Sequence, residues 1–314
     1  MDIDWTLIAS KIPLTEALIR RGSSFKAIPP REVGTPFRGS QLKDLCPRQE
    51  ALCSFHEVWR EDEIRPDLEL IFAIGSGIHE GLQQRLLKDF LVGSWRCNGC
   101  GATYGSMDRL AAIPERCKGK IYDWEADELK PCPNHNYVED VVEDWHLPGF
   151  DYKEIDLSHS DPTLYSHPDG ILWRGEGEPP DVITVDDPLL EVLEIKSASE
   201  RALKYGYGSS PPLRDEPYAP HKDQLMLYMY VLGIKFGRIL YYDKAAFGLR
   251  SSLCEHTIIL DQEYVEESIL AGPLAVEKAI REKDPTLAPK VCTSANCSKA
   301  RACPVQEYCW ANDE

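Results

Sequence analysis

The most informative stretch of the sequence is a short apolar run, Leu189 to Lys196, that carries charged side chains near its end. Its composition predicts a β-strand, in which residues two apart point to the same face. Glu194 and Lys196 then point one way, and Leu193 and Ile195 point the other. A carboxylate beside an ammonium group can bind a divalent metal ion and position a water molecule. Taken alone, this pair also fits an ordinary solvated strand face.

A second carboxylate stands at a spacing that brings it to the same place. Asp169 lies 25 residues before Glu194 and directly precedes a strand that we expect over residues 170–173. Two carboxylates on adjacent strands can share a hard cation through their oxygen atoms. The two segments together therefore indicate a site for a divalent metal ion.

Two further segments carry polar groups on expected helices, which cover residues 77–91 and 221–232. Gln224 and Tyr228 place an amide and a phenol one turn apart on one face of the second helix. His79 falls at the start of the first helix, where a capping or surface histidine is the simpler interpretation. Each of these signals is weak on its own.

Taken in chain order, these residues resemble the RecB-like branch of the PD-(D/E)XK nucleases. That family has a helix histidine, then G-x-x-D, then E-x-K, then Q-x-x-x-Y, and all four elements occur here in this order, from His79 to Tyr228. The sequence departs from the pattern at Ser166, where the family usually has glycine. This departure changes a turn and not a ligand.

The resemblance implies a DNA nuclease that depends on Mg²⁺ or Mn²⁺. It implies that three side chains bind the metal: His79, Asp169 and Glu194. It further implies that Lys196 orients the attacking water. By the same match, Gln224 and Tyr228 support the site and the DNA strand. A metal ion suits this reaction because it neutralises the anionic phosphate oxygens and lowers the pKa of a bound water.

The 11 cysteines of the chain cluster, which indicates metal or cluster ligation rather than disulfides. Cys97-Asn-Gly-Cys100 is one C-x-x-C knuckle, and Cys132-Pro-Asn-His135 is a second pair at the same spacing. These four ligands suit a tetrahedral, structural Zn²⁺. Cys117 lies between the pairs and is the obvious substitute ligand. The alternative is that these are ordinary reduced cysteines. We expect this stretch to be an insertion that needs its metal to fold.

Four more cysteines crowd the C-terminal tail: Cys292, Cys297, Cys303 and Cys309. Some RecB-like nucleases, including the CRISPR-adaptation exonucleases and the AddAB-type repair nucleases, hold a 4Fe–4S cluster. They use one cysteine before the nuclease motifs and three after them. By this resemblance Cys46, Cys303 and Cys309 are ligands. Ala300 stands where the family has its first C-terminal ligand, so either Cys292 or Cys297 must serve. A second zinc site built from the four tail cysteines alone is the alternative.

The elements that must position these groups alternate between strand and helix patterns, which predicts an α/β fold. We expect further strands over residues 181–185 and 238–242, a helix over 263–283 interrupted at Gly272-Pro273, and a coil from residue 290. The resemblance implies a restriction-endonuclease-like PD-(D/E)XK core with a zinc-knuckle insert and a shell stapled by an iron–sulfur cluster. The expected boundaries are an N-terminal helical segment (1–94), the insert (95–140), the nuclease core (141–250) and the C-terminal helix with its cluster tail (251–314).

Composition limits the possible partners. The chain has 314 residues, of which 35 are Lys or Arg and 52 are Asp or Glu, and the net charge is −17. An acidic body does not steer nucleic acid toward itself, so local basic patches or bound metal ions must supply positive charge. No signal-peptide pattern is visible, and the apolar stretch over residues 225–234 is too short to cross a bilayer. We therefore expect a cytoplasmic protein without a membrane partner.

These observations predict a metal-dependent DNA nuclease, and specifically an exonuclease that acts on DNA ends or single strands. DNA is the expected partner, with a helicase or a recombination or adaptation protein as a conceivable second one. Two alternatives stay open. One is a catalytically silent DNA-binding protein on the same fold. The other is a subunit of a recombination, repair or CRISPR-adaptation complex whose cleavage needs a partner.

Overall fold

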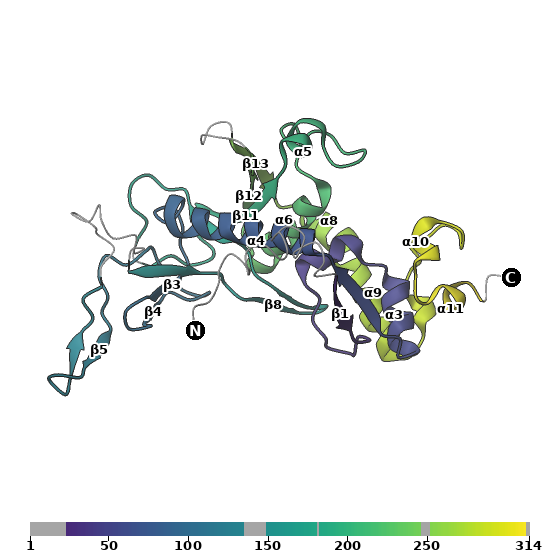
Figure 1. The fold of residues 1–314 in the computed structure, drawn as a ribbon, viewed down its shortest axis with the longest axis horizontal. Coiled ribbons are helices and arrows are strands. Elements are labelled where there is room, and N and C mark those ends of the chain that lie inside the picture. The colour runs from purple at the N-terminus through teal and green to yellow at the C-terminus, as the bar shows by residue number, and fades with distance from the viewer. Residues whose placement is uncertain (1–22, 135–148, 181, 246–251, 312–314) are drawn as a thin grey trace, which may run out of the picture.

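The computed structural model describes residues 23–134, 149–180, 182–245 and 252–311. It shows a mixed α/β chain that is elongated along one axis (Figure 1). A four-stranded sheet lies near the middle, a long hairpin projects at one end, and the short C-terminal helices lie at the other. Within the described residues, no helix is long and apolar enough to cross a membrane.

The central sheet has the strand order β10-β11-β12-β13. These strands are β10 (Gly170–Trp173), β11 (Leu190–Ala198), β12 (Phe236–Asp243) and β13 (Leu253–Ile259). The β11–β12 pair is parallel, and the two outer pairs are antiparallel. A parallel pair needs a long crossover, which here contains α5 (Glu200–Tyr205) and α6 (Ala219–Leu232). The sequence predicted β10, β11, α6 and β12, and the structure confirms all four.

Strand β11 is buried on both faces, as its nearly unbroken apolar run requires. On one face, Val192 belongs to the same core cluster as Leu225 and Met229 of α6. Gly237 of β12 allows this helix to approach closely, because a Cβ there would lie 2.6 Å from the Met229 sulfur. Gly233 ends α6 in the left-handed conformation, which glycine adopts without strain.

The opposite face of the sheet is covered by a small three-stranded sheet of order β4-β3-β7. It consists of β3 (Ser94–Cys97), β4 (Thr103–Tyr104) and β7 (Phe150–Lys153), and the hairpin β5 (Lys120–Asp123) and β6 (Glu128–Pro131) projects beyond it. Trp95 is fully buried and belongs to one core cluster with Leu193 and Leu240 of the central sheet. The cysteine-bearing insert therefore shares a core with the central sheet. The insert boundaries expected from the sequence, residues 95–140, remain a prediction.

Several shorter elements lie outside these two sheets, and some of them connect the N-terminal and C-terminal parts of the chain. They are β1 (Ser24–Ile28), η1 (Gly39–Asp44), α3 (Pro47–Phe55), β2 (Arg60–Ile64), β8 (Leu157–Ser160), β9 (Thr163–Ser166), η4 (Pro285–Leu287), α10 (Ser298–Arg301) and α11 (Gln306–Trp310). Strands β1 and β2 form an antiparallel hairpin. The guanidinium of Arg48 in α3 donates hydrogen bonds to the carbonyl oxygens of Ala288 and Thr286, at 2.6 and 3.0 Å. The N-terminal segment is thereby fixed to the C-terminal one.

The helix predicted over residues 77–91 is misplaced in the sequence interpretation. Helix α4 (Pro66–Gly81) starts eleven residues earlier and continues as the π-helical turn η2 (Leu82–Leu86). Leu86 and Phe90, which completed the predicted apolar stripe, are exposed. Proline at the first helical position, where its missing N–H costs nothing, favours the earlier start.

Three other expectations also differ from the structure. Ile183 forms only an isolated bridge to Leu110 where a strand was expected, and residue 181 lies outside the described residues. The single helix predicted over residues 263–283 is divided in the structure into three elements: α8 (Gln262–Tyr264), the π-helical η3 (Val265–Ile269) and α9 (Ala271–Glu282). Gly272-Pro273 falls in the first turn of α9, where proline does not interrupt a helix. The expected C-terminal coil contains the two short helices α10 and α11.

Two tryptophans test whether the insert and the central sheet are one folding unit. Trp95 has 0% of its surface exposed and donates a hydrogen bond to the Ala111 carbonyl oxygen at 3.0 Å, whereas Trp124 is 86% exposed. We expect Trp95→Ala to lower the free energy of unfolding by about 3–5 kcal/mol in urea titrations. Trp124→Ala should change it by less than about 0.5 kcal/mol. Equal effects of the two substitutions would contradict a shared core.

Candidate active site and metal centres

The side chains of Glu194 and Lys196 lie on the same face of β11 and form an ion pair, as the strand pattern predicted. Glu194 is 1% exposed, so its carboxylate is almost completely removed from water. Burial, followed by the negative charge of Asp169, raises the pKa of Glu194, although Lys196 and His79 oppose the shift. Burial lowers the pKa of Lys196, but the charges of Glu194 and Asp169 outweigh burial and raise it.

Asp169 reaches the same point from the start of β10. Because β10 pairs antiparallel with β11, with Gly170 opposite Leu193, the preceding aspartate lies beside the charged end of β11. One carboxylate oxygen of Asp169, Oδ2, accepts a hydrogen bond from the Ile195 backbone N–H at 2.6 Å. The other, Oδ1, lies 3.1 Å from His79 Nδ1. This arrangement fixes the carboxylate and turns one oxygen toward the histidine.

His79 comes from the last turn of α4, not from a helix start as the sequence suggested. Burial lowers the pKa of its imidazole, but the hydrogen bond to Asp169 and the charges of Asp169 and Glu194 outweigh burial and raise it. The imidazole therefore contacts a carboxylate, which excludes the simple surface histidine that we considered from the sequence.

The sequence analysis missed Gln83, which lies one helical turn beyond His79 in the π-helical segment η2. This buried amide donates hydrogen bonds to the Asp169 carbonyl oxygen at 2.6 Å and to Glu154 Oε1 at 3.1 Å. It thereby holds the backbone that carries Asp169. The four-residue spacing from His79 was the only sequence signal for this role, and such spacings are common in helices.

Gln224 and Tyr228 lie on α6, which packs over the same end of the sheet. The Gln224 amide donates to the Tyr228 hydroxyl at 2.7 Å, and the phenol ring is buried. Burial and the nearby charge of Glu194 raise the pKa of Tyr228, so its hydroxyl stays protonated. Gly39 packs closely beside this ring. A side chain does not fit there, because a Cβ would lie 2.9 Å from the phenol ring and 3.1 Å from Ser166 Oγ. Ser166, the departure from the family pattern, thus borders Tyr228 and accepts the Gly39 N–H at 2.8 Å.

The donor atoms of this group suit a hard divalent cation. An imidazole nitrogen and two carboxylates are neighbours here, although their three ligand atoms do not all lie within 4.8 Å of one another. Oxygen-rich sets of this kind favour Mg²⁺ or Mn²⁺. Glu194 Oε2 is buried and has no hydrogen-bond partner among the described residues. A buried carboxylate oxygen without a partner is costly unless a cation or a proton satisfies it. The donor types therefore suit a metal ion at this position, and a proton on Glu194, whose pKa is raised, would satisfy the same oxygen.

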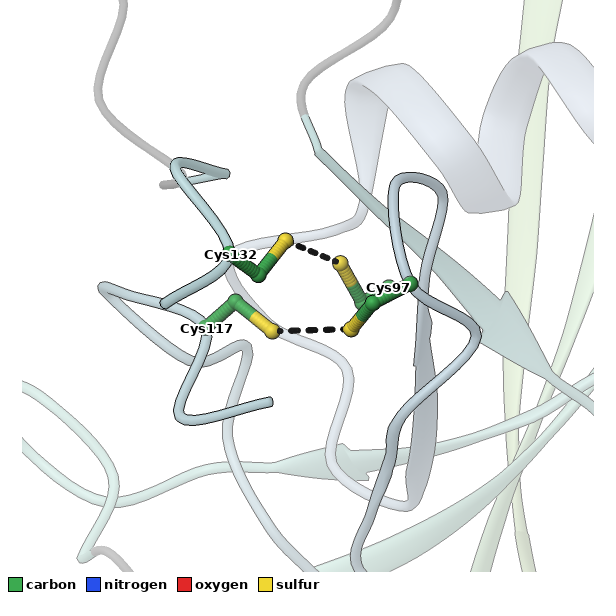
Figure 2. A group of neighbouring side chains, drawn as sticks. Cys97, Cys117 and Cys132 are labelled. Atoms are coloured by element: carbon green, nitrogen blue, oxygen red, sulfur yellow. Dashed lines mark hydrogen bonds between the residues drawn. The ribbon is translucent and has the colours of Figure 1, made fainter. Parts of the chain in front are cut away.

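A second group consists of four thiols in the insert. The sulfur atoms of Cys97, Cys100, Cys117 and Cys132 all lie within 4.8 Å of one another. Figure 2 shows Cys97, Cys117 and Cys132 turned toward a common centre. The Cys97–Cys132 and Cys100–Cys117 sulfurs are 3.6 and 3.4 Å apart. Cys117, the substitute ligand of the sequence analysis, completes this group, and His135 lies outside the described residues.

The surroundings favour the thiolate form, which metal binding needs, at Cys97, whereas burial raises the pKa of Cys132 to about 12. Burial raises the pKa of Cys97, but hydrogen bonds from the backbone of Cys100 and Gly99 and from neighbouring thiols lower it to about 6. The Tyr104 hydroxyl and the Gly119 N–H donate to Cys117 Sγ at 3.1 and 3.2 Å. Donors of this kind orient the ligands of metal sites. Four soft ligands in one compact group fit a tetrahedral Zn²⁺, and they also suit an iron–sulfur centre.

The outer cysteines meet at the other end of the molecule. Cys46, Cys292, Cys303 and Cys309 line one small cavity between the start of α3 and the C-terminal tail. Cys297 instead caps α10, because its sulfur accepts the Ala300 N–H at 3.3 Å. Among the described residues, no three of these outer sulfurs lie within 4.8 Å of one another. They are thus spread more widely than the four thiols of the insert.

Comparisons with known proteins give no family. No protein-family model and no curated protein matches the chain. Among solved structures, the crystal structure of SSO0001 is similar over 86% of each chain, with a TM-score of 0.34 and 13% identity. An alkaline exonuclease (LHK-Exo) from Laribacter hongkongensis is similar over 41% of this chain and 60% of its own, with a TM-score of 0.26 and 17% identity. Likeness at this level assigns neither a fold nor an activity to this chain.

The compact thiol group predicts which residues hold metal in the insert. Elemental analysis should find about one Zn²⁺ per chain at this site, and Cys117→Ser should lose it as completely as Cys97→Ser does. The physical reason is that a three-thiolate remnant leaves the tetrahedral ion with a weaker hydroxyl ligand.

His135→Ala is the matched control for this experiment and should retain the metal. Cys254→Ser, which removes a thiol from β13 outside the group, should retain it as well. Loss of Zn²⁺ in His135→Ala with retention in Cys117→Ser would reverse our assignment of the fourth ligand.

Proposed function

We propose that this chain is a metal-dependent DNA nuclease. The observation that supports the proposal most directly is the contact between His79 and Asp169 beside the buried ion pair of Glu194 and Lys196. A structural ion pair alone does not need a buried carboxylate oxygen without a partner, whereas a metal ligand does. The order of these residues in the chain also matches the RecB-like nuclease pattern.

Each side chain has a role that follows from its contacts. Asp169 Oδ1, Glu194 Oε2 and an imidazole nitrogen of His79 would hold Mg²⁺ or Mn²⁺, which supplies Lewis acidity and a water of lowered pKa when bound. Lys196, held by Glu194, orients that water and places positive charge beside the scissile phosphate. Asp169 stays in place because Gln83 and the Ile195 N–H hold it from two sides.

The helix α6 forms the other wall of this site. The Tyr228 hydroxyl keeps its proton and can donate to a phosphate oxygen, and Gln224 fixes its direction. In this proposal the substrate is a DNA end or a single strand, which makes the activity that of an exonuclease. A catalytically silent chain, or one that cleaves only with a partner protein, is the alternative that the activity measurement decides.

Two further metal centres belong to the proposal. The insert holds a structural Zn²⁺ through its four thiolates, with no open coordination position. A 4Fe–4S cluster links Cys46 to the tail, with Cys292, Cys303 and Cys309 as the other ligands. The wider spread of these thiols supports a cluster over a single ion, because a cluster distributes its ligands over four irons.

The active-site assignment predicts loss of cleavage without loss of fold. Glu194→Gln and Asp169→Asn should each lower Mn²⁺-dependent cleavage of end-labelled DNA by more than about 100-fold, since even lost outer partners of metal ligands cost about 10–100-fold. Both variants should keep the wild-type melting temperature. The amides are nearly isosteric, and an asparagine at 169 can still accept the Ile195 N–H.

Glu255→Gln removes a carboxylate from β13 of the same sheet, where the side chain is 60% exposed, and it should cleave normally. Calorimetric titration with Mn²⁺ gives a readout that does not depend on activity. If Glu194→Gln cleaves DNA and binds Mn²⁺ like the wild type, the site assignment is wrong. A wild-type chain that binds Mn²⁺ but cuts no DNA favours the partner-dependent alternative.

The cluster assignment predicts colour and iron. Protein purified without oxygen should be brown, with iron and sulfide in equal amounts, and Cys46→Ser and Cys292→Ser should bleach it. Cys297→Ser should stay brown, because this thiol caps α10 and does not line the cavity. Colourless protein that binds a second Zn²⁺ at the tail, with Cys46 dispensable, would support the zinc alternative instead.

A further inference from the structure

A hollow of about 370 Å³ lies just beyond the end of β11. It begins at Ser199, directly after the last residue of the strand that carries Glu194 and Lys196. Its walls include Arg201 and the rings of Tyr205 and Tyr207. None of these side chains has a role in the proposed reaction, although the hollow adjoins the strand that would carry it.

The charges around the hollow differ from those of the chain as a whole. Lys204 and Glu200 of α5 neutralise each other in an ion pair of 2.5 Å. Arg201 is exposed and forms no ion pair with any residue that the structure describes, and no carboxylate lines the hollow. In a protein with a net charge of −17, this leaves one available guanidinium beside a site free of negative charge.

Two aromatic rings stand at the same hollow. Tyr205 is 70% exposed and Tyr207 is 38% exposed. Tyr207 packs edge-on against Tyr218, with the ring centroids 5.0 Å apart, so its position is supported from behind. Large aromatic side chains left open to solvent beside a cation are typical of surfaces that bind single-stranded nucleic acid.

The backbone around the hollow is fixed rather than loose. Gly206 has φ of +74°, and a Cβ there would collide with the carbonyl oxygens of Ser210 and Pro211, so only glycine fits. The buried Leu213 donates its N–H to the Ala202 carbonyl oxygen at 3.2 Å, which folds the loop back onto α5. The backbone that carries the two tyrosines is therefore fixed before any ligand binds.

We propose that this hollow binds one nucleotide of a single-stranded DNA substrate, with a phosphate on Arg201 and a base stacked on the exposed ring of Tyr205. The inference rests on the proposed nuclease function and adds the strand that the site holds. Stacking reads no sequence, because every base has an aromatic face.

The test is fluorescence anisotropy with a fluorescein-labelled oligothymidylate and the full-length protein in Ca²⁺. Tyr205→Ala should raise Kd about tenfold or more, and Tyr205→Phe should bind like the wild type because it keeps the ring. Arg201→Gln should raise Kd and reduce the slope of log Kd against log salt by about one unit. Lys204→Gln, which removes the same charge three residues away, should change neither quantity. Thymidine 5′-monophosphate as a competitor separates a site for a free nucleotide, which it would block, from one that needs a strand.

The inference is overturned if Tyr205→Ala and Arg201→Gln bind like the wild type, or if Lys204→Gln weakens binding as much as Arg201→Gln. Absence of wild-type binding to the oligonucleotide also overturns it and leaves the hollow to a peptide or another partner. Cleavage of end-labelled DNA by the same preparations separates this failure from that of the proposed function. A wild type that never cleaves but loses DNA affinity in Tyr205→Ala refutes the nuclease and retains the hollow. A wild type that cleaves DNA, with hollow variants that all cleave equally well, refutes the hollow and retains the nuclease.

Discussion

Burial of the Glu194 carboxylate on a central strand is the constraint to which the rest of the molecule responds. Moving a charged carboxylate out of water is unfavourable by several kcal/mol, and it persists only where partners compensate it. Lys196 supplies one partner from the same strand, yet one carboxylate oxygen stays without any among the described residues. The negative charge of the adjacent Asp169 repels the Glu194 carboxylate and further disfavours its charged form. Two neighbouring carboxylates on the inner part of a sheet are stable together when a proton or a bound cation reduces their repulsion, and the proposed metal site is the second of these solutions.

The elements around β11 meet that requirement from three directions. Strand β10 delivers Asp169, α4 delivers His79, and α6 places Tyr228 against the same strand end. The insert packs on the opposite face, where Trp95 shares a core cluster with Leu193. The zinc-type thiol group is part of that cluster, since Cys97 and Cys132 belong to it. The metal expected in the insert would thus stabilise the core that supports strand β11 from the face opposite Glu194.

The sequence predicted the parts of the fold in which apolar periodicity and burial coincide. Strand β11 is buried almost throughout, and helix α6 is buried along most of its second half, so their patterns are clear. Helix α4 was misplaced because its own apolar residues, such as Leu70 and Phe72, are exposed and show no stripe. Strand β2 is charged along most of its length and was missed altogether. Within the site, the sequence spacing predicted that Asp169 and Glu194 meet across neighbouring strands, but it did not predict Gln83. The role of Gln83 depends on a backbone carbonyl that only the folded chain brings near.

The effect of the strongly acidic composition on DNA depends on where the individual charges lie and not only on the net charge. Acidic surface repels a polyanion over the range of the Debye length, about 10 Å in ordinary salt, and beyond that range it has little effect. In the proposed nuclease, a phosphate at the end of β11 would meet Lys196, a cation held by Asp169 and Glu194, and Arg201 at the hollow. Such a distribution attracts DNA weakly from a distance and binds it only where these groups converge. It therefore favours a strand that is threaded into the site over duplex bound along the surface, because a duplex would lie against the acidic body along its whole length.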